Sequence, residues 1–108
     1  MPSAAASDRM LRSLNKNYWD AVSISQLPPY AATFSKHGAL DDVRNEAVLV
    51  HGHKSHYVFC ICTKNNTDQS WQSSNEAWQL TRAISALLWN YFEKEDNWQP
   101  AADADTFN

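Results

Sequence analysis

The chain has 108 residues, of which 44% are hydrophobic and 19% charged, with five Trp, four Tyr and four Phe. This length and composition predict one folded domain with a modest core and exclude a largely disordered polypeptide. The net charge is -3 and Lys and Arg are scattered, so no basic surface for a nucleic-acid backbone is expected. No apolar run approaches the ~20 residues of a membrane-spanning helix. We therefore expect neither a nucleic acid nor a membrane among the partners.

The first part of the chain is predicted to be a helix followed by turns. Ser7 is placed to cap that helix, and the alanines at 4–6 could extend it backwards. Its apolar residues recur at helical spacing and are Met10, Leu11, Leu14 and Tyr18. A turn-rich piece at 20–26 follows, and the proline pair at 28–29 prevents a helix from continuing. The helix is therefore expected to end before the extended segments begin.

Three short apolar segments are predicted to be strands. Residues 30–36 form the first, which Gly38 ends, 44–50 form the second and 57–63 the third. The loop at 51–56 makes a hairpin between the last two. Along the third strand, one set of side chains is Val58, Cys60 and Cys62, and the alternating set is Tyr57, Phe59 and Ile61. Both sets are apolar, which is typical of a strand covered on both sides.

A long helix is predicted near the end of the chain. Ser73 and Glu76 have the spacing of a capping box, and the helix runs to about residue 93. The apolar stripe expected to face the sheet consists of Ala77, Leu80, Ile84, Leu87 and Tyr91, widened by Trp78, Trp89 and Phe92. The tail at 94–108 is acidic and is expected to be disordered apart from Trp98.

Together these elements predict an α+β fold, a three-stranded antiparallel meander with an N-terminal helix and a long C-terminal helix packed on it. One or two helices cover one face of such a sheet but not both. We therefore expect an apolar patch larger than the roughly few hundred Å² usual for a monomer. It should consist of whichever set of 57–63 side chains the C-terminal helix leaves uncovered.

The cysteines and histidines do not indicate a metal centre, and no cofactor is predicted. Cys60 and Cys62 lie one residue apart in a strand, where a disulfide would be strained, so two buried free thiols are expected. The 51–56 loop holds three histidines. It lies about 13–20 Å along the strand from the thiols, so four zinc ligands do not converge. A solvent-exposed polar turn is the preferred interpretation.

Specific residues occupy characteristic places in this order of elements. Ser35-Lys36-His37-Gly38 ends the first strand, and Arg44-Asn45-Glu46-Ala47-Val48 and Tyr57-Val58-Phe59-Cys60-Ile61 follow on either side of the hairpin. Asn75-Glu76-Ala77 opens the last helix, which ends in Leu88-Trp89-Asn90-Tyr91-Phe92. From about residue 3 to residue 92, the chain resembles the C-terminal part of a class A β-lactamase-like (penicillin-recognising) serine hydrolase. Lys36-x-Gly38 resembles the Lys-Thr-Gly element of that family.

The resemblance implies hydrolysis of a β-lactam or a related amide through an acyl-enzyme. In that family the Lys-Thr-Gly strand forms one wall of the site, and its Lys faces the substrate carboxylate. Lys36, His37 and Gly38 are therefore the candidate substrate-binding residues. Arg44 is either a further donor to the same carboxylate or a surface Arg paired with an aspartate of the 41–42 turn. His37 replaces the usual Thr or Ser, which puts lactam specificity in doubt.

No catalytic residue is predicted in this chain. The family's Ser-x-x-Lys and Ser-Asp-Asn elements would lie upstream of residue 1. The string Ser13-Leu14-Asn15-Lys16 matches the first of them, but it lies at the end of a predicted helix, only 20 residues before Lys36. Because the motif requires a helix N-terminus in a cleft, we interpret this match as chance. The chain alone should therefore be inactive.

The expected organisation is the C-terminal portion of a β-lactamase-like domain at 1–93, followed by the tail at 94–108. The expected partners are a β-lactam or acyl-amide small molecule, and either the missing N-terminal part or a second copy. The alternative is a small non-enzymatic interaction module that pairs through an open sheet face or edge. No export signal is visible at residues 1–7, although the resemblance implies a family that is typically periplasmic or secreted. The substrate and the oligomeric state stay open.

Overall fold

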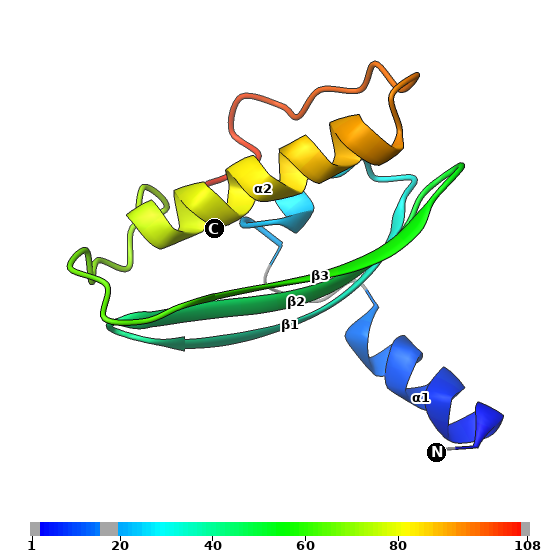
Figure 1. Ribbon diagram of the computed structural model, residues 1–108, viewed down its shortest axis with the longest axis horizontal. Helices are drawn as coiled ribbons and strands as arrows, with labels where there is room; N and C mark the ends of the chain where they lie inside the picture. The colour runs from blue at the N-terminus through cyan, green and yellow to red at the C-terminus, as the bar shows by residue number, and fades with distance from the viewer. Residues whose placement is uncertain (1–2, 16–19, 107–108) are drawn as a thin grey trace.

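A computed structural model describes residues 3–15 and 20–106 of the chain. Its elements, in chain order, are α1 (Ala4–Leu14), the short 3-10 helix η1 (Ile24–Gln26), β1 (Ala32–Leu40), β2 (Val43–His51), β3 (His56–Thr63) and α2 (Glu76–Phe92). Figure 1 shows α2 and η1 on one side of a curved sheet and α1 on the other. This is the predicted α+β arrangement. Neither helix in the described part is long and apolar enough to span a membrane.

The strands form an antiparallel meander in the order β1-β2-β3, as predicted. The prediction that Gly38 ends the first strand is wrong, since β1 continues to Leu40 and Gly38 lies opposite Asn45. The reason is the tight turn at 41–42, which keeps Leu40 paired with Val43 and so carries the ladder to the end of the hairpin. A glycine inside a strand marks open space or a close approach as readily as an end.

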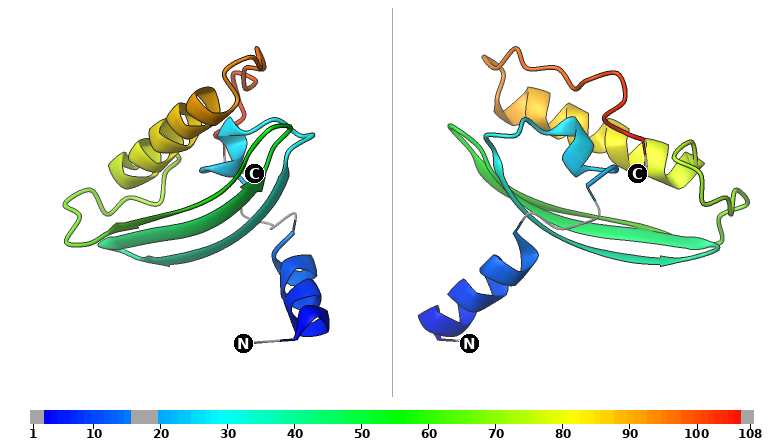
Figure 2. Two further views of the ribbon diagram at one scale, coloured as in Figure 1. Left: turned by 45° about the vertical axis from the view of Figure 1, so that its right-hand side comes forward. Right: turned by 180° about the vertical axis from the view of Figure 1, so that it is seen from behind.

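The sheet has an inner face, which α2 covers, and an outer face, from whose side α1 projects away from the strands (Figure 2). The apolar half of the core is formed by Leu27, Ala31, Val48, Val50 and Trp89, with Tyr57 and Phe59 packed against it. The other half of the inner face is polar, because Arg44 and Glu46 of β2 are 1% and 4% exposed. A buried charge is expensive unless it is hydrogen-bonded, so both groups need partners, although Arg44 Nη1 has none among the described residues.

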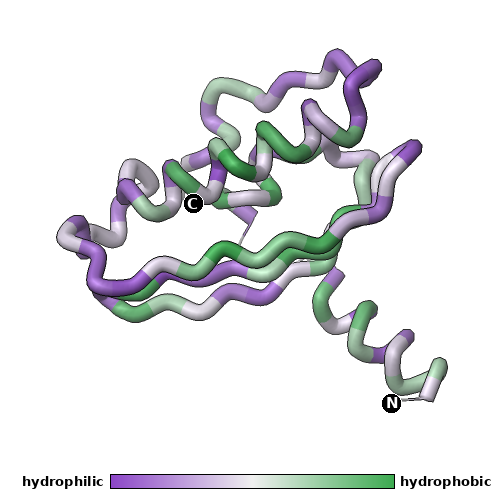
Figure 3. Tube along the Cα trace, in the orientation of Figure 1, coloured by the Kyte–Doolittle hydropathy of each residue, from purple (hydrophilic) through white to green (hydrophobic). Residues whose placement is uncertain are grey.

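The face of α2 that contacts the sheet was predicted only in part. Ala77, Trp78 and Trp89 of the expected stripe are buried, whereas Leu80, Leu87 and Tyr91 are 48%, 67% and 62% exposed. The buried residues of the helix are Ala77, Trp78, Thr81, Arg82, Ser85 and Trp89. Figure 3 shows that apolar residues recur along the whole of α2, so hydropathy alone does not choose a face. The polar half of the core decides it, because Arg82 donates to Ala21 O (2.9 Å) and Ser85 to Ser23 O (2.8 Å).

Both helix caps differ from the prediction. Asn75, and not the Ser73–Glu76 capping box, opens α2, because Asn75 Oδ1 accepts from the backbone N–H groups of Ala77 (2.9 Å) and Trp78 (3.3 Å). Ser3 caps α1 by accepting from Ala6 N at 3.1 Å, and Ser7 lies inside that helix. Asn and Ser are both strong caps, so the choice between neighbouring candidates depends on where the chain enters the helix.

The β3 side chains that α2 leaves uncovered are those on the outer face of the sheet. Tyr57, Phe59 and Ile61 lie on the inner face and are half-buried. Val58 on the outer face is 65% exposed, and Cys60 and Cys62 are exposed free thiols. The expectation of a bare outer set is therefore confirmed, but the expectation of buried thiols is wrong. The physical reason is that α1 packs against β1, at the opposite edge of the sheet from β3.

The described part of the acidic tail returns beside α2 (Figure 1). Arg82 Nη2 donates to Asp105 O at 3.3 Å, Trp98 N donates to Asp96 Oδ1 at 2.7 Å, and the Tyr30 hydroxyl donates to Asp96. The expected disorder of this tail stays a prediction.

Glu93, at the end of α2, holds the β2–β3 hairpin loop. Its carboxylate, 4% exposed, accepts from His53 N (2.9 Å), Lys54 N (3.1 Å) and Ser55 Oγ (2.7 Å). Gly52 allows this close approach, because a Cβ there would lie 3.0 Å from Trp89 Cζ3 and 3.1 Å from Glu93 Cδ. Burial pushes the pKa of Glu93 upward, but the hydrogen bonds from Ser55, Lys54 and His53 outweigh it and lower the pKa from 4.5.

We predict that Glu93→Gln lowers the free energy of unfolding by about 1–3 kcal/mol, since it weakens charge-assisted hydrogen bonds at a buried position. A carboxyl with a lowered folded pKa stabilises the fold above its unfolded pKa, and this contribution is lost as the pH falls below about 4.5. Urea unfolding at pH 7 and at pH 3.5 measures both effects, and the variant should show a smaller loss on acidification. Glu95→Gln is the matched control, because Glu95 pairs with Lys54 at the surface. Equal losses in the two variants would contradict this role.

Candidate functional site

Lys36 and Gly38 lie together on the outer side of an edge strand. Alternate β1 residues Thr33 and Ser35 are buried on the inner face, so Lys36 and Gly38 point the other way, and both are exposed. Lys36 Nζ donates to its neighbour's carbonyl, His37 O, at 2.6 Å. A Cβ at Gly38 would have no atom within 4 Å. This stretch therefore offers a cation and an open strand edge to a ligand.

His37 lies on the opposite face from Lys36. Its Nε2 is 3.0 Å from Glu46 Oε2, and the two side chains are 14% and 3% exposed. Glu46 Oε1 also accepts from the Ser23 hydroxyl and, at 3.3 Å, from Ser23 N. Ser23 O in turn accepts from Ser85 Oγ of α2 at 2.8 Å. The His37 imidazole thus belongs to a buried network that ties β1 to α2 through β2, and it does not face the surface that holds Lys36.

Arg44 is also on the inner face, where it is 1% exposed. Its guanidinium carbon lies 4.1 Å from the ring centroid of Trp71 and 4.4 Å from that of Trp78. The same group donates to Leu40 O (2.9 Å), Asp41 O (3.0 Å) and Gln69 O (3.2 Å). This placement argues against a substrate role for Arg44 and for a structural one. The sequence offered two alternatives for Arg44, a surface pairing with an aspartate of the 41–42 turn or a bond to a ligand carboxylate. Neither describes the observed position of its guanidinium.

Ser13 lies at the C-terminal end of α1 and is exposed. Its hydroxyl donates to Arg9 O, one turn earlier, at 3.0 Å. Lys16 of the Ser13-x-x-Lys16 string is outside the described residues. A nucleophile of this family opens a helix, so the position of Ser13 agrees with the interpretation of the string as chance.

The hairpin histidines make two separate ring contacts and do not converge on one point. The His51 and His56 rings contact each other across the strands at 3.9 Å, and His53 stacks on Tyr30 at 4.7 Å. Within the described part of the chain, no group of three or more His, Cys, Asp or Glu side chains is placed to hold a metal ion. Cys60 and Cys62 are exposed on β3 and form no disulfide. No cofactor is assigned to any of these residues.

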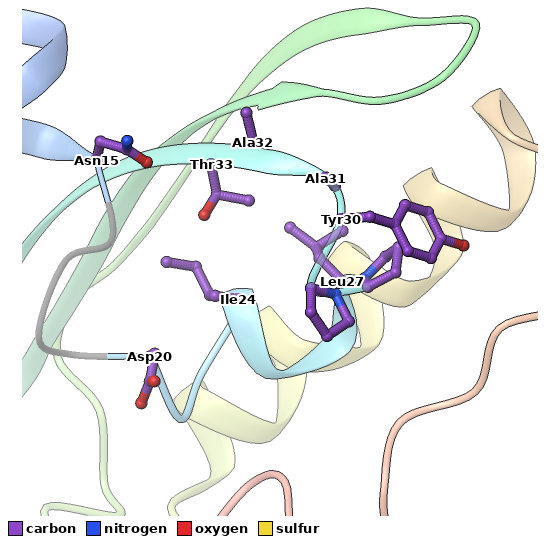
Figure 4. Close-up of a pocket in the computed structure, with 10 residues that line it drawn as sticks. Asn15, Asp20, Ile24, Leu27, Tyr30, Ala31, Ala32 and Thr33 are labelled. Atoms are coloured by element: carbon purple, nitrogen blue, oxygen red, sulfur yellow. The ribbon is translucent and has the colours of Figure 1, made fainter.

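A cavity of about 500 Å³ lies between η1 and the start of β1 (Figure 4). Apolar and polar side chains line it, and they include Ile24, Leu27, Tyr30, Asp20 and Thr33. None of the four candidate substrate-binding residues is among its lining residues, so it is separate from the Lys36 surface.

Because Arg44 is buried on the inner face and Lys36 is exposed on the outer face, substitutions at the two positions should change the free energy of unfolding by very different amounts. Arg44→Ala removes a buried group with three carbonyl acceptors and two aromatic contacts, so we expect a loss of more than about 2 kcal/mol in the free energy of unfolding. Arg44→Lys should recover only part of it, because an ammonium lacks the planar fork. Lys36→Ala should change stability by less than about 0.5 kcal/mol. Chemical denaturation of the three variants checks this, and a large loss for Lys36→Ala would place Lys36 in the core network.

Known proteins are similar to this chain in sequence and in fold. Among solved structures, PBP-A superimposes with a TM-score of 0.71 at 18% identity, over 85% of this chain and 33% of its own. A PBP-A mutant solved as an acyl-enzyme complex with penicillin G gives the same values. A halotolerant bacterial β-lactamase gives 0.66 at 15% identity, over 84% of this chain and 35% of its own. A comparison with curated protein sequences gave no match.

These structural likenesses are low in identity and show the fold. The chain spans about a third of the length of the structures it matches. In sequence, the family model described as "Beta-lactamase2: Beta-lactamase enzyme family" matches residues 1–92, which is most of the chain. The resemblance found in the Lys36-x-Gly38 strand, the hairpin and the terminal helix is therefore confirmed: this chain belongs to the β-lactamase enzyme family and has the fold of the corresponding part of a β-lactamase-like serine hydrolase.

Proposed function

We propose that this chain supplies the Lys36-x-Gly38 wall of the substrate site in a β-lactamase-like serine hydrolase. The reaction would be hydrolysis of a β-lactam or related amide through an acyl-enzyme. The single observation that carries the proposal is the exposure of Lys36 and Gly38 on the outer side of an edge strand, where a Cβ at Gly38 would have no atom within 4 Å. The family membership supplies the reaction class.

Each part of the wall has a simple chemical task. The Lys36 ammonium supplies positive charge toward a substrate carboxylate. Beyond the bridge of Asn15 to Phe34, the outer edge of β1 offers backbone N–H and C=O groups, to which an extended acyl-amide can add as a further strand. The absence of a side chain at Gly38 lets the ligand approach the backbone. His37 stabilises the wall from the inner face of the sheet, because its contact with Glu46 holds β1 against β2.

The nucleophile is the part that the described residues do not provide. We propose that Ser-x-x-Lys and Ser-Asp-Asn elements come from polypeptide corresponding to the other two-thirds of the structural relatives. That polypeptide would also cover the outer face of the sheet, including Val58, Cys60 and Cys62. Residues 1–93 would then be one portion of a β-lactamase-like domain, with 94–108 appended to it.

The chain by itself should therefore hydrolyse a chromogenic cephalosporin no faster than buffer, because it lacks a positioned serine and base. Joined to in-frame upstream polypeptide with the two missing elements, it should form a covalent adduct with a fluorescent penicillin. Lys36→Ala should slow that acylation about 10–100-fold, the loss expected for one charge-assisted hydrogen bond. Lys64→Ala, which removes an exposed cation just beyond β3, is the matched control.

Three outcomes would sink this proposal. One is an upstream reading frame without either element, and another is equal acylation rates for Lys36→Ala and Lys64→Ala. The third is turnover by the isolated chain that Ser13→Ala abolishes, which would make the Ser13-x-x-Lys16 string functional after all.

A second candidate function is favoured by the sheet edges. β1 and β3 both end the sheet as described, and the outer face of β3 is apolar. Such an edge can pair with a strand of another protein, as in a non-enzymatic interaction module. An upstream stop codon and start site, together with capture of a strand peptide that protects β3 amides from hydrogen exchange, would favour this candidate over the hydrolase.

A further inference from the structure

The solvent side of α2 is apolar and carries no charge. Its four central residues, Leu80, Ile84, Leu87 and Tyr91, are called the outer seam below. Leu80, Leu87 and Tyr91 are 48%, 67% and 62% exposed, and Ile84 is half-buried. The one charged residue between Glu76 and Glu93 is Arg82, which is 6% exposed and donates to Ala21 O and Ser73 O. An exposed helix face normally carries charged and polar side chains, so this one is unusual for a surface.

The spacing of the outer seam is that of a helix–helix interface. Leu80, Ile84, Leu87 and Tyr91 are separated by four, three and four residues, the alternation of a two-helix seam. Single exposed apolar residues need no explanation, but a continuous stripe of this kind marks an interaction surface. The flanking exposed positions are also uncharged, namely Gln79, Ala83 and Asn90.

The structure leaves the outer seam accessible. Figures 1 and 2 show α2 above the sheet with η1 between them, and the returning tail runs past α2 at its far side from the sheet and then behind the helix. Near its end the tail reaches the buried side of α2, where Arg82 bonds to both Ala21 O and Asp105 O. The seam itself is accessible, because Leu80, Leu87 and Tyr91 are exposed.

We propose that this chain forms a two-fold symmetric dimer in which α2 pairs antiparallel with α2 of a second copy through the outer seam. An antiparallel pairing places Leu80 opposite the second copy's Tyr91 and Ile84 opposite its Leu87, so the surface is complementary to itself. Each aromatic ring then meets an aliphatic side chain. Because neither seam carries a charge, self-pairing brings no like charges together along its length.

Charges at the two ends of α2 favour this direction. Asp68 and Glu76 lie at the first turn, where Glu76 N donates to Asp68 Oδ2 at 2.9 Å. This bond and those from Ser70 lower the pKa of Asp68, which keeps its carboxylate charged at neutral pH. Lys94 lies at the other end, with Nζ 5.4 Å from the Tyr91 ring centroid. Antiparallel pairing brings Lys94 near the second copy's Glu76, whereas parallel pairing would bring like charges together and align the helix dipoles.

The other acidic groups at that end are already engaged. Glu93 holds the hairpin loop, Glu95 pairs with Lys54, and Asp96 accepts from Tyr30. Lys94 is therefore the charge that remains beside the seam. The dimer is independent of the proposed hydrolase function, because α2 lies on the inner side of the sheet and Lys36 on the outer side.

Sedimentation velocity of the full chain over a range of concentrations tests the dimer without any β-lactam. The seam is short, so we expect a monomer–dimer equilibrium with a dissociation constant on the order of 10 μM. Leu87→Glu should weaken it at least tenfold, since each protomer then buries a carboxylate. Val58→Glu is the matched control, because Val58 is 65% exposed on the outer sheet face and Leu87 67% exposed on the seam. Circular dichroism of each variant verifies that the fold is kept.

A charge exchange tests the direction of the pairing. Lys94→Glu should weaken the dimer several-fold, and the double variant Glu76→Lys with Lys94→Glu should restore it, since each contact is again between opposite charges. In a parallel dimer the double variant would not recover. A chain that stays monomeric at about 200 μM, or a dimer that Val58→Glu breaks and Leu87→Glu does not, would overturn the proposal.

Discussion

The guanidinium of Arg44 is the buried group around which the polar half of this fold is arranged. It lies against the rings of both Trp71 and Trp78 and donates to three backbone carbonyls. A buried cation without such partners would destabilise the fold by several kcal/mol. The loop between β3 and α2 must therefore return over the sheet far enough to bring Trp71 and Gln69 O to the guanidinium. That path sets where Asn75 caps α2, and so fixes the start of the helix.

The same constraint explains which face of α2 packs inward. Beside Arg44, the carboxylate of Glu46 needs donors, and it finds them in His37 and Ser23. Ser23 then bonds to Ser85, so the side of the helix with Arg82 and Ser85 must face the sheet. Trp78 and Trp89 lie on that side and add apolar contacts at both ends. The polar groups thereby select the orientation, and the more apolar stripe is left at the surface.

The order and approximate position of the elements could be predicted because β2, β3 and α2 contain apolar runs of the right length, bounded by turn and cap residues. The face of α2 could not, because hydropathy scores apolar stripes and ignores long-range bonds such as those of Arg82 to Ala21 O. For the candidate site, the alternation of residues along a strand places Lys36 and Gly38 on one face and His37 on the other. The sequence alone could therefore have separated His37 from the candidate substrate-binding residues. The burial of Arg44 had no such signal, since it depends on Trp71 reaching back over the sheet from a loop.

The core between the sheet and α2 differs from the two exposed apolar surfaces, which are the outer sheet face and the outer seam of α2. The layer between sheet and α2 is closed by bonds among its own residues, from His37 through Glu46 and Ser23 to Ser85, so it holds together without a partner. The outer sheet face and the outer seam of α2 contribute nothing to those bonds and lie on opposite sides of the molecule. A partner on one therefore leaves the other free. Because Lys36 shares the outer sheet face, the proposed substrate site requires a partner on that face, and a partner on α2 affects only the assembly.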